Sequence, residues 1–250
     1  MFEPFTIVAI AGAFLIGGVV KGVIGLGLPS VSLALLAVII DLPSAMALIV
    51  MPTFFTNVWQ ALVGGNGKVL VVRLWPFFLL AAVTVWIGAS ALTRVDLAWL
   101  SALLGVLLMI YSLVNLGGFQ FKTSPRHEVW LGPLMGSMNG VFMGMTGSAV
   151  VPGVMYLQSL GLVRDVLVQA MGILFMVTTL ALGIALQHNA FLTVQNGVVS
   201  LASLIPAIIG MMVGQRLRRK LSESVFRKVL FISLLALGVY LVAVALSPEY

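Results

Sequence analysis

The chain contains no cysteine and very little charge. Because none of its 250 residues is Cys, disulfides, thiolate chemistry and Cys-ligated metals are excluded. Charged residues make up only 8% of the chain, hydrophobic residues make up 61%, and the mean hydropathy is +1.19. A water-soluble domain needs a polar surface, so this composition predicts an integral membrane protein whose main partner is the lipid bilayer.

Acidic residues are absent from the interior of the apolar runs. Each one falls in a loop or at the end of an apolar segment: Glu3, Asp41, Asp96, Glu128, Asp165, Glu223 and Glu249. The two histidines, His127 and His188, are also in loops. No intramembrane carboxylate is evident that would carry protons or bind a coupling cation. No nucleophile with a base, metal cluster or cofactor site can be assembled, so we expect a protein that is not an enzyme.

Basic residues give the chain a net charge of +6 and lie mainly in the loops. We interpret them as topology signals rather than as a nucleic-acid surface. The first four residues, MFEP, contain an acid and no base, so they do not resemble a secretory signal.

Apolar runs between charges and turn signals define the organisation of the chain. Ten segments are expected: 5–22, 28–40, 43–64, 70–92, 96–116, 129–145, 148–161, 164–186, 190–213 and 225–246. The second and seventh are only 13 and 14 residues long. At 1.5 Å per residue they reach roughly 20 Å, short of a bilayer core of roughly 30 Å, so they are half-helices or hairpin arms. The other eight are long enough to span.

The segment lengths follow the same order twice: long, short, long, long, long. We therefore expect one transmembrane domain over residues 1–250 made of two repeats, about 1–118 and about 129–250, joined by a loop at 117–128. In each repeat, a broken or re-entrant helical hairpin precedes three transmembrane helices. The predicted fold is thus an all-α polytopic membrane protein.

Loop charges predict the orientation of the repeats. The loop at 215–228 is rich in Lys and Arg, which places it in the cytoplasm. Counting segments back from it places Lys68 and Lys122 in the cytoplasm and both termini outside. The third and eighth segments then point in opposite directions, so the repeats are inverted. Each hairpin begins and ends on one side, and whether it is re-entrant or fully spanning stays open.

Two glycine-rich stretches interrupt the apolar sequence, VKGVIGLGLP at 20–29 and NGVFMGMTGSAVVP at 139–152. Gly is unfavourable inside a helix and Pro removes a backbone donor, so each stretch should break its helix. Broken backbone at membrane depth survives only where it is buried in protein or lines a wet cavity. Two such breaks therefore indicate a site, with the tips of both hairpins meeting near the midplane.

We expect the arms that begin near Leu28 and Ser148 to point helix N-termini into that site, an arrangement that suits a small anion. Ser30 and Ser148 are placed to cap the arms or to contact a ligand. The glycines that would let a ligand approach the backbone are Gly25, Gly27, Gly144 and Gly147. The alternative is that the glycines only allow close helix packing, as the spacings Gly18/Gly22 and Gly136/Gly140/Gly144 also would.

Lys21 is the one charged residue well inside an apolar run. A cation beside the first break favours an anionic ligand, and the alternative is that its long stem carries the charge to the nearer interface. The third segment adds a polar stripe at helical spacing: Thr53, Thr56, Asn57 and Gln60. The matching eighth segment offers Gln169, Thr178 and Thr179. These stripes line the site or hold helices together.

The stretches GGVVKGVIGLGLPSVSLALL and GSMNGVFMGMTGSAVVPGVMYL resemble the TauE/SafE sulfite exporter family, also called the toluene sulfonate uptake permeases. The resemblance covers essentially the whole chain and implies transport of small sulfur-containing anions in bacteria. It implies a substrate site at both breaks: Lys21, Gly22, Gly25, Gly27, Leu28, Pro29, Ser30, Asn139, Gly140, Gly144, Thr146, Gly147 and Ser148. Asn57 is added from the polar stripe.

The sequence therefore predicts a secondary transporter that moves sulfite or an organosulfonate across the bacterial inner membrane by alternating access. A passive anion channel built on the same helix dipoles is the main alternative. A structural membrane subunit is a further alternative, although it would not need two matched breaks. The identity of the anion, the direction of transport, the coupling ion and the oligomeric state stay open.

Overall fold

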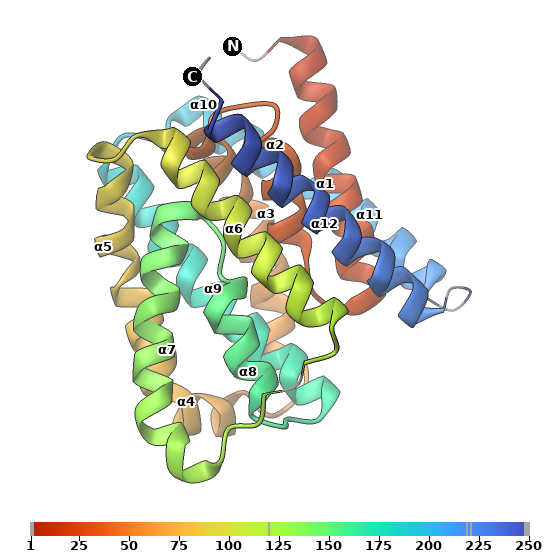
Figure 1. Cartoon of the computed structure of the whole chain (residues 1–250). Coiled ribbons are helices and arrows are strands. Elements are labelled where there is room, and N and C mark those ends of the chain that lie inside the picture. Colours follow the sequence, from red (N-terminus) through yellow and green to blue (C-terminus); the bar gives the residue numbers. More distant parts are fainter. Residues whose placement is uncertain (1–2, 120, 219, 221, 248–250) are drawn as a thin grey trace.

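The computed structural model describes residues 3–119, 121–218, 220 and 222–247, and every regular element in this part is a helix (Figure 1). The first half contains α1 (Pro4–Ile24), α2 (Leu28–Leu36), α3 (Leu42–Leu62), α4 (Gly67–Val83), α5 (Val85–Ala89), the 3-10 turn η1 (Ser90–Thr93) and α6 (Leu97–Leu116). The second half contains α7 (Pro125–Thr146), the π-turn η2 (Val150–Val154), α8 (Met155–Ser159), α9 (Arg164–His188), α10 (Val194–Ala202), α11 (Leu204–Leu217) and α12 (Glu223–Ala245). The predicted all-α class is confirmed.

The ten predicted segments appear in the predicted order, and three of them are subdivided. Segment 70–92 becomes α4, α5 and η1, segment 148–161 becomes η2 and α8, and segment 190–213 becomes α10 and α11. The two short arms are shorter than predicted, with nine residues in α2 and five in α8. Both are therefore too short to cross a bilayer.

Seven helical stretches of the described chain are long and apolar enough to cross a membrane. The sequence predicts eight, and the difference is α7. This helix has 22 residues, but its first turn contains Arg126, His127 and Glu128, and it carries Ser137 and Asn139 further on. Length alone therefore overestimated how apolar this segment is.

Charged and hydroxylated residues at the segment ends act as helix caps. The carboxylate of Asp41 accepts a hydrogen bond from the backbone N–H of Ser44 at 2.9 Å, and that of Asp96 accepts one from Ala98 at 2.9 Å. Thr193 caps α10 in the same way. A cap satisfies backbone donors that the first turn leaves free, which explains why these polar residues stand where apolar runs begin.

The matching helices α3 and α9 pack against each other in opposite directions. Gly64 lies against Gln169, Gly172 against Gln60 and Ala61, and Gly183 against Val50, so residue numbers rise along one helix as they fall along the other. The pair is also the centre of the buried core, since α3 is enclosed over most of its length.

Each long hairpin arm packs against a helix of the other half. Helix α1 contacts α11 through Gly18 and Gly22, whose missing side chains leave room for the backbone around Gly210 and Gly214. Helix α7 contacts α4 and α5 through Gly136, Gly140 and Gly144. Small residues let helix backbones approach closely, and both interfaces use them at intervals of four residues.

The last helices of the two halves, α6 and α12, also form a pair, with Gly105 against Gly238 and the rings of Tyr111 and Phe231 in edge-to-face contact. Equivalent helices of the two halves thus pair with each other, and the first hairpin arm of each half packs against the other half. This pattern of contacts is what a two-fold relation between the halves requires, while the inverted relation of the complete halves stays a prediction.

The connections divide between two ends of the molecule. The start of α1 and the end of α12 lie together at the top of Figure 1, and the connections after α6 and α8 lie at the bottom. The long apolar side chains on the outer faces are exposed, including Ile7, Val72 and Ile232. In a membrane protein this surface faces lipid.

Candidate functional site

The first predicted break is present between α1 and α2. Helix α1 ends at Ile24, and Gly25 adopts a left-handed conformation (φ +87°) from which its N–H bonds the carbonyl of Lys21 at 2.8 Å. Gly27 is also left-handed (φ +106°), and α2 begins at Leu28 with Pro29 in its first turn. Side chains other than Gly rarely adopt these φ values, so the two glycines set the reversal of the chain.

Lys21 lies one turn before this break and is almost fully buried, with 4% of its surface exposed. Its ammonium donates to Asn57 Oδ1 at 2.7 Å and to Thr56 Oγ1 at 3.1 Å, both on α3. Both acceptors are neutral, and the one salt bridge found among the described residues joins Arg73 and Glu128 elsewhere. The partners found for the Lys21 side-chain nitrogen in the described structure are therefore two neutral oxygen atoms.

The polar stripe on α3 is oriented by its own helix. Thr56 donates to the carbonyl of Pro52 at 2.7 Å, and Asn57 Nδ2 donates to the carbonyl of Thr53 at 2.7 Å. The amide orientation leaves Asn57 Oδ1 free to accept from Lys21. Thr56 and Asn57 therefore present oxygen atoms to the cation in fixed positions.

A hydroxyl from α10 bonds the backbone of α3 near Pro52. Pro52 has no N–H, so the carbonyl of Leu48 loses its partner within the helix. Ser200 Oγ donates to that carbonyl at 2.7 Å and accepts from the N–H of Met51 at 3.1 Å. Sequence reasoning missed Ser200, although the free carbonyl that Pro52 creates predicts a donor from some neighbouring helix.

Two glutamines of the predicted stripes hold α3 and α9 together. Gln60 Nε2 donates to the carbonyl of Val168 at 2.6 Å, and Gln169 Nε2 donates to the carbonyl of Ala61 at 2.8 Å. Gln169 Oε1 also accepts from the N–H of Asn66 at 3.0 Å. The helix-joining interpretation of the stripes therefore holds for Gln60 and Gln169.

The second predicted break follows α7, but its geometry differs from the first. Gly147 is left-handed (φ +76°) and its N–H bonds the carbonyl of Met143 at 2.8 Å. The N–H of Ser148 donates to Thr146 Oγ1, and the backbone is non-helical at Val151 within η2. The α-helix N-terminus expected near Ser148 is therefore wrong, because the chain passes through an irregular π-turn before the five residues of α8.

Asn139 and Ser148 leave polar atoms unpaired at the second break. Asn139 is fully buried, and its Oδ1 accepts from the N–H of Gly153 at 3.1 Å. Its Nδ2 and the hydroxyl of Ser148 have no hydrogen-bond partner among the described residues. Thr53 and Thr179, on α3 and α9, also have unpaired buried hydroxyls. An unpaired buried polar atom costs roughly 1–3 kcal/mol, so such atoms mark places where a ligand or water would be favourable.

The structure assigns packing contacts to several glycines that the resemblance places in the site. A side chain at Gly22 would meet the backbone of α11, and side chains at Gly140 and Gly144 would meet the backbones of α4 and α5. Gly25 faces Val168 of α9, and Gly147 faces Leu33 and Met46. The packing alternative thus holds for the spacings Gly18/Gly22 and Gly136/Gly140/Gly144. Whether any of these glycines also contacts substrate stays a prediction.

The remaining predicted residues are enclosed around the two breaks. Leu28, Pro29, Ser30, Thr146 and Ser148 are all buried. Because Gly147 lies against Leu33, the second break contacts the same short helix that the first break begins. The two breaks are therefore linked through α2, and both adjoin α3, which carries the partners of Lys21 and also Met46.

The family profile described as Sulfite exporter TauE/SafE matches residues 9–241. The match covers nearly the whole chain and includes both breaks, so the chain belongs to this family of membrane transporters. The family gives no reason to assign an enzymatic reaction. No curated protein and no solved structure matches the chain.

Proposed function

We propose that this protein is a secondary transporter that carries a small sulfur-containing anion, such as sulfite or an organosulfonate, by alternating access. The observation that carries the proposal is Lys21. It is a buried cation beside a broken helix, and its bonded partners are two neutral oxygen atoms. Removing an ammonium from water costs on the order of several kcal/mol, and a bound anion would offset that cost.

The neighbouring groups suit an oxyanion. Helix α2 begins at Leu28, and the positive end of its dipole lies at the first break. The hydroxyl of Ser30 is in its first turn. From the second break, Asn139 Nδ2 and the Ser148 hydroxyl are available as donors, because both lack partners in the described structure. Family membership supports sulfur as the central atom of the ligand.

The packing supports a mechanism in which two units move against each other. The first hairpin arm of each half contacts the other half through a glycine-rich interface, α1 on α11 and α7 on α4 and α5. Small sliding movements of packed helices are a known form of shear motion, and these interfaces have few large side chains that would have to repack. In the mechanism that we propose, rocking about the α3–α9 pair exposes the breaks to each side in turn.

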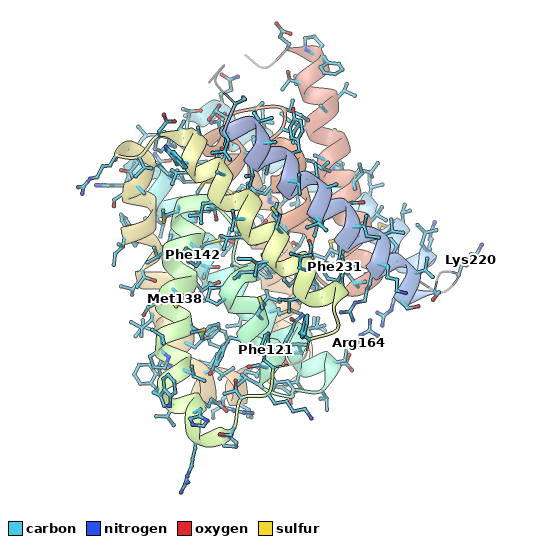
Figure 2. The ribbon with its side chains drawn as sticks, viewed as in Figure 1. Phe121, Met138, Phe142, Arg164, Lys220 and Phe231 are labelled. Atoms are coloured by element: carbon cyan, nitrogen blue, oxygen red, sulfur yellow. The ribbon has the colours of Figure 1, made fainter. Side chains whose placement is uncertain are left out.

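We further propose that the end of the molecule bearing the connections after α6 and α8 faces the cytoplasm. Lys122 and Arg164 are at this end, and Arg218 and Arg227 flank the connection between α11 and α12. Figure 2 shows Lys220 extending from that connection. Positively charged loops favour the cytoplasmic side, which leaves both termini outside a bacterial inner membrane.

Flux measured in proteoliposomes tests the proposal. Purified protein is offered radiolabelled sulfite, with thiosulfate, taurine, sulfoacetate and carboxylates as competitors. Saturable uptake that is stimulated by unlabelled anion on the opposite side is expected. An unsaturable conductance would instead identify a channel. The absence of flux with every sulfur anion would overturn the transport proposal in favour of a structural subunit.

Labelling of single cysteines tests the orientation. The chain has no native Cys, so Lys122→Cys introduces a single thiol. A membrane-impermeant maleimide should react only from the cytoplasmic side, while a thiol at Phe5 should react only from outside. Reaction of the residue-122 thiol only from outside would contradict the proposed orientation.

A further inference from the structure

Two adjoining cavities lie between the first break and the 117–124 connection, and basic side chains line both. The larger has a volume of about 350 Å³ and is lined by Lys122 and Arg227 together with the amides of Asn115 and Gln158. The smaller, about 150 Å³, shares Asn115, Gln158 and Arg227 and reaches Leu26 at the first break. We refer to the two cavities together as the vestibule.

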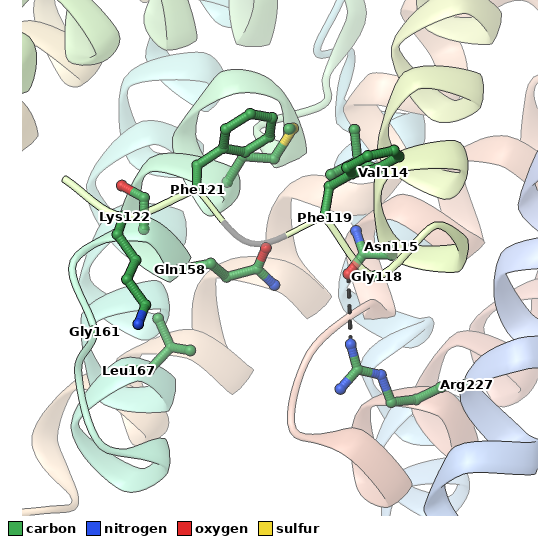
Figure 3. A pocket seen from close by; sticks show the side chains of 12 residues that line it. Val114, Asn115, Gly118, Phe119, Phe121, Lys122, Gln158, Gly161, Leu167 and Arg227 are labelled. Atoms are coloured by element: carbon green, nitrogen blue, oxygen red, sulfur yellow. Dashed lines mark hydrogen bonds between the residues drawn. The ribbon is translucent and has the colours of Figure 1, made fainter.

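Arg227 projects into the vestibule from α12. Its guanidinium donates to Asn115 Oδ1 at 3.5 Å and lies 5.9 Å from the centre of the Phe231 ring. Figure 3 shows Arg227 and Asn115 on one side of the larger cavity, with Lys122 and Gln158 across from them. The contacts found for Arg227 thus use one weak hydrogen bond and a ring face, which leaves most of its five donors available.

The described lining of the vestibule contains three basic residues, Lys122, Arg164 and Arg227, and no acid. Figure 2 labels Arg164 and Phe231, which line the smaller cavity. The hydroxyl of Tyr111, which also lines it, is buried beside the amide of Gln158. The vestibule therefore combines the charges of Lys122 and Arg227 with unused donors of the Arg227 guanidinium, the chemistry that binds an oxyanion.

A further cavity contains a basic residue that is paired with a carboxylate. A cavity of about 330 Å³ between α4 and α7 is lined by Arg73, but there Glu128 accepts two hydrogen bonds of 2.7 Å from the same guanidinium. Two cavities of similar size thus differ, since one contains an arginine that is paired with a carboxylate, and the larger cavity of the vestibule contains Lys122 and Arg227 with no acid in its described lining.

We propose that the vestibule is a second oxyanion-binding site, distinct from the breaks, where Arg227 and Lys122 bind a sulfate-like or phosphate-like group. Only its role as an entry or exit point for substrate depends on the transport function proposed above. The anion comes either from solution or from the headgroup of an anionic lipid, since both present the same oxygen atoms to the arginine.

The reactivity of a single thiol measures this charge without any transport assay. Leu167 lines both cavities of the vestibule, and Val129 lines the cavity between α4 and α7, so Leu167→Cys and Val129→Cys form a matched pair in this Cys-free chain. Each is treated in maltoside micelles with 2-sulfonatoethyl methanethiosulfonate, an anion, and with its trimethylammonium analogue, a cation. The ratio of the two rates cancels differences in exposure.

We expect the anion-to-cation rate ratio to be about 10-fold higher for Leu167→Cys than for Val129→Cys, because a positive cavity concentrates anions. Arg227→Gln should lower the Leu167→Cys ratio toward that of Val129→Cys. Lys122→Gln should lower the Leu167→Cys ratio by a smaller factor. Because Lys122 is exposed, this variant provides an independent test if Arg227→Gln does not fold. Equal ratios at the two positions would overturn the proposal.

The same thiol identifies the source of the anion. Slower labelling of Leu167→Cys on addition of sodium sulfate, at constant ionic strength set with chloride, indicates a dissolved oxyanion. Slower labelling with phosphatidylglycerol and not with sulfate indicates a lipid headgroup. Failure of both to slow labelling would overturn oxyanion binding, whatever the flux assay shows.

Discussion

The two breaks occupy corresponding places in the halves, yet they are built from different chemistry. The first joins a 21-residue helix to the nine-residue α2 through two left-handed glycines and has the buried ammonium of Lys21 beside it. The second has one left-handed glycine, a π-turn and a five-residue helix, and no charged residue lies between Val129 and Val163. It carries an amide and a hydroxyl that lack partners within the described structure.

If an anion binds between the breaks, this difference predicts a division of roles. A cation and a helix N-terminus attract an anion at long range, whereas a neutral amide and hydroxyl select for the positions of its oxygen atoms. An anion bound between the breaks would thus receive its charge compensation from the first half and hydrogen bonds from the second. The predictions below alter one break at a time.

The largest effect is expected for Gly147→Val at the second break. The left-handed backbone at φ +76° would cost a valine about 1–2 kcal/mol, and its Cβ would lie 2.8 Å from Met46 Cγ. We expect transport to be lost while membrane insertion continues, since one valine hardly changes hydropathy. Flux in proteoliposomes and the amount of inserted protein are measured together.

Gly65→Val is the matched control for this change. Gly65 has almost the same φ, +74°, but nothing lies within 4 Å of the Cβ position. Its backbone strain is therefore equal and its steric effect is absent. Equal loss of transport in both variants would attribute the effect to strain and not to contact at the second break.

The next largest effect is expected for Lys21→Met, which removes the charge at the first break. Hydrogen bonds to charged groups contribute about 1.5–3 kcal/mol, so the apparent dissociation constant for sulfite should rise about 10- to 150-fold. Lys21→Arg keeps the charge and should be milder. Binding is followed by the shift in thermal unfolding that added anion produces.

Lys68→Met is the control for Lys21→Met, because Lys68 is exposed at the start of α4. It should leave affinity within about twofold of the unaltered protein. Affinity within the same limits for Lys21→Met would mean that the ligand does not use this charge, and the asymmetry between the breaks would then be structural only.

A smaller effect is expected for Ser148→Ala at the second break. A neutral hydrogen bond contributes about 0.5–1.5 kcal/mol, so affinity should fall about 2- to 12-fold if the hydroxyl contacts the anion. Stability without ligand should stay the same or rise, because the hydroxyl is buried without a partner among the described residues.

Ser112→Ala supplies the comparison for Ser148→Ala. Ser112 is also a buried serine with an unpaired hydroxyl in the described structure, but it lies on α6 and in neither break. It should change ligand-free stability in the same direction and leave affinity unchanged. Identical affinity in both variants would remove Ser148 from the site.

Local sequence patterns predicted the elements of the fold well, and the site less well. Hydropathy and the Gly and Pro positions predicted the order of all ten segments, because each depends on neighbours in the chain. The second break was predicted to open an α-helix at Ser148, and it opens a π-turn instead. Local composition there is compatible with both, and contacts such as the Gly153 N–H to Asn139 Oδ1 bond select one.

The role of each polar residue depended on partners distant in the sequence. Asn57 and Gln60 lie three residues apart on α3, yet Asn57 accepts from Lys21, whereas Gln60 donates to Val168 of α9. No local signal separates the two. The same holds for the glycines, since Gly22 is pressed against α11 and Gly25, one turn later, is not.

The sequence by itself determined that this chain is a membrane protein with two broken helices and one lysine within an apolar run, because hydropathy, backbone freedom and charge are properties of single residues and short windows. Only the tertiary structure decided that Lys21 bonds to α3, that the hairpin arms pack on opposite halves, and that Arg227 and Lys122 line one cavity. These relations join residues that are tens to hundreds of positions apart, so they exist only once the helices have packed.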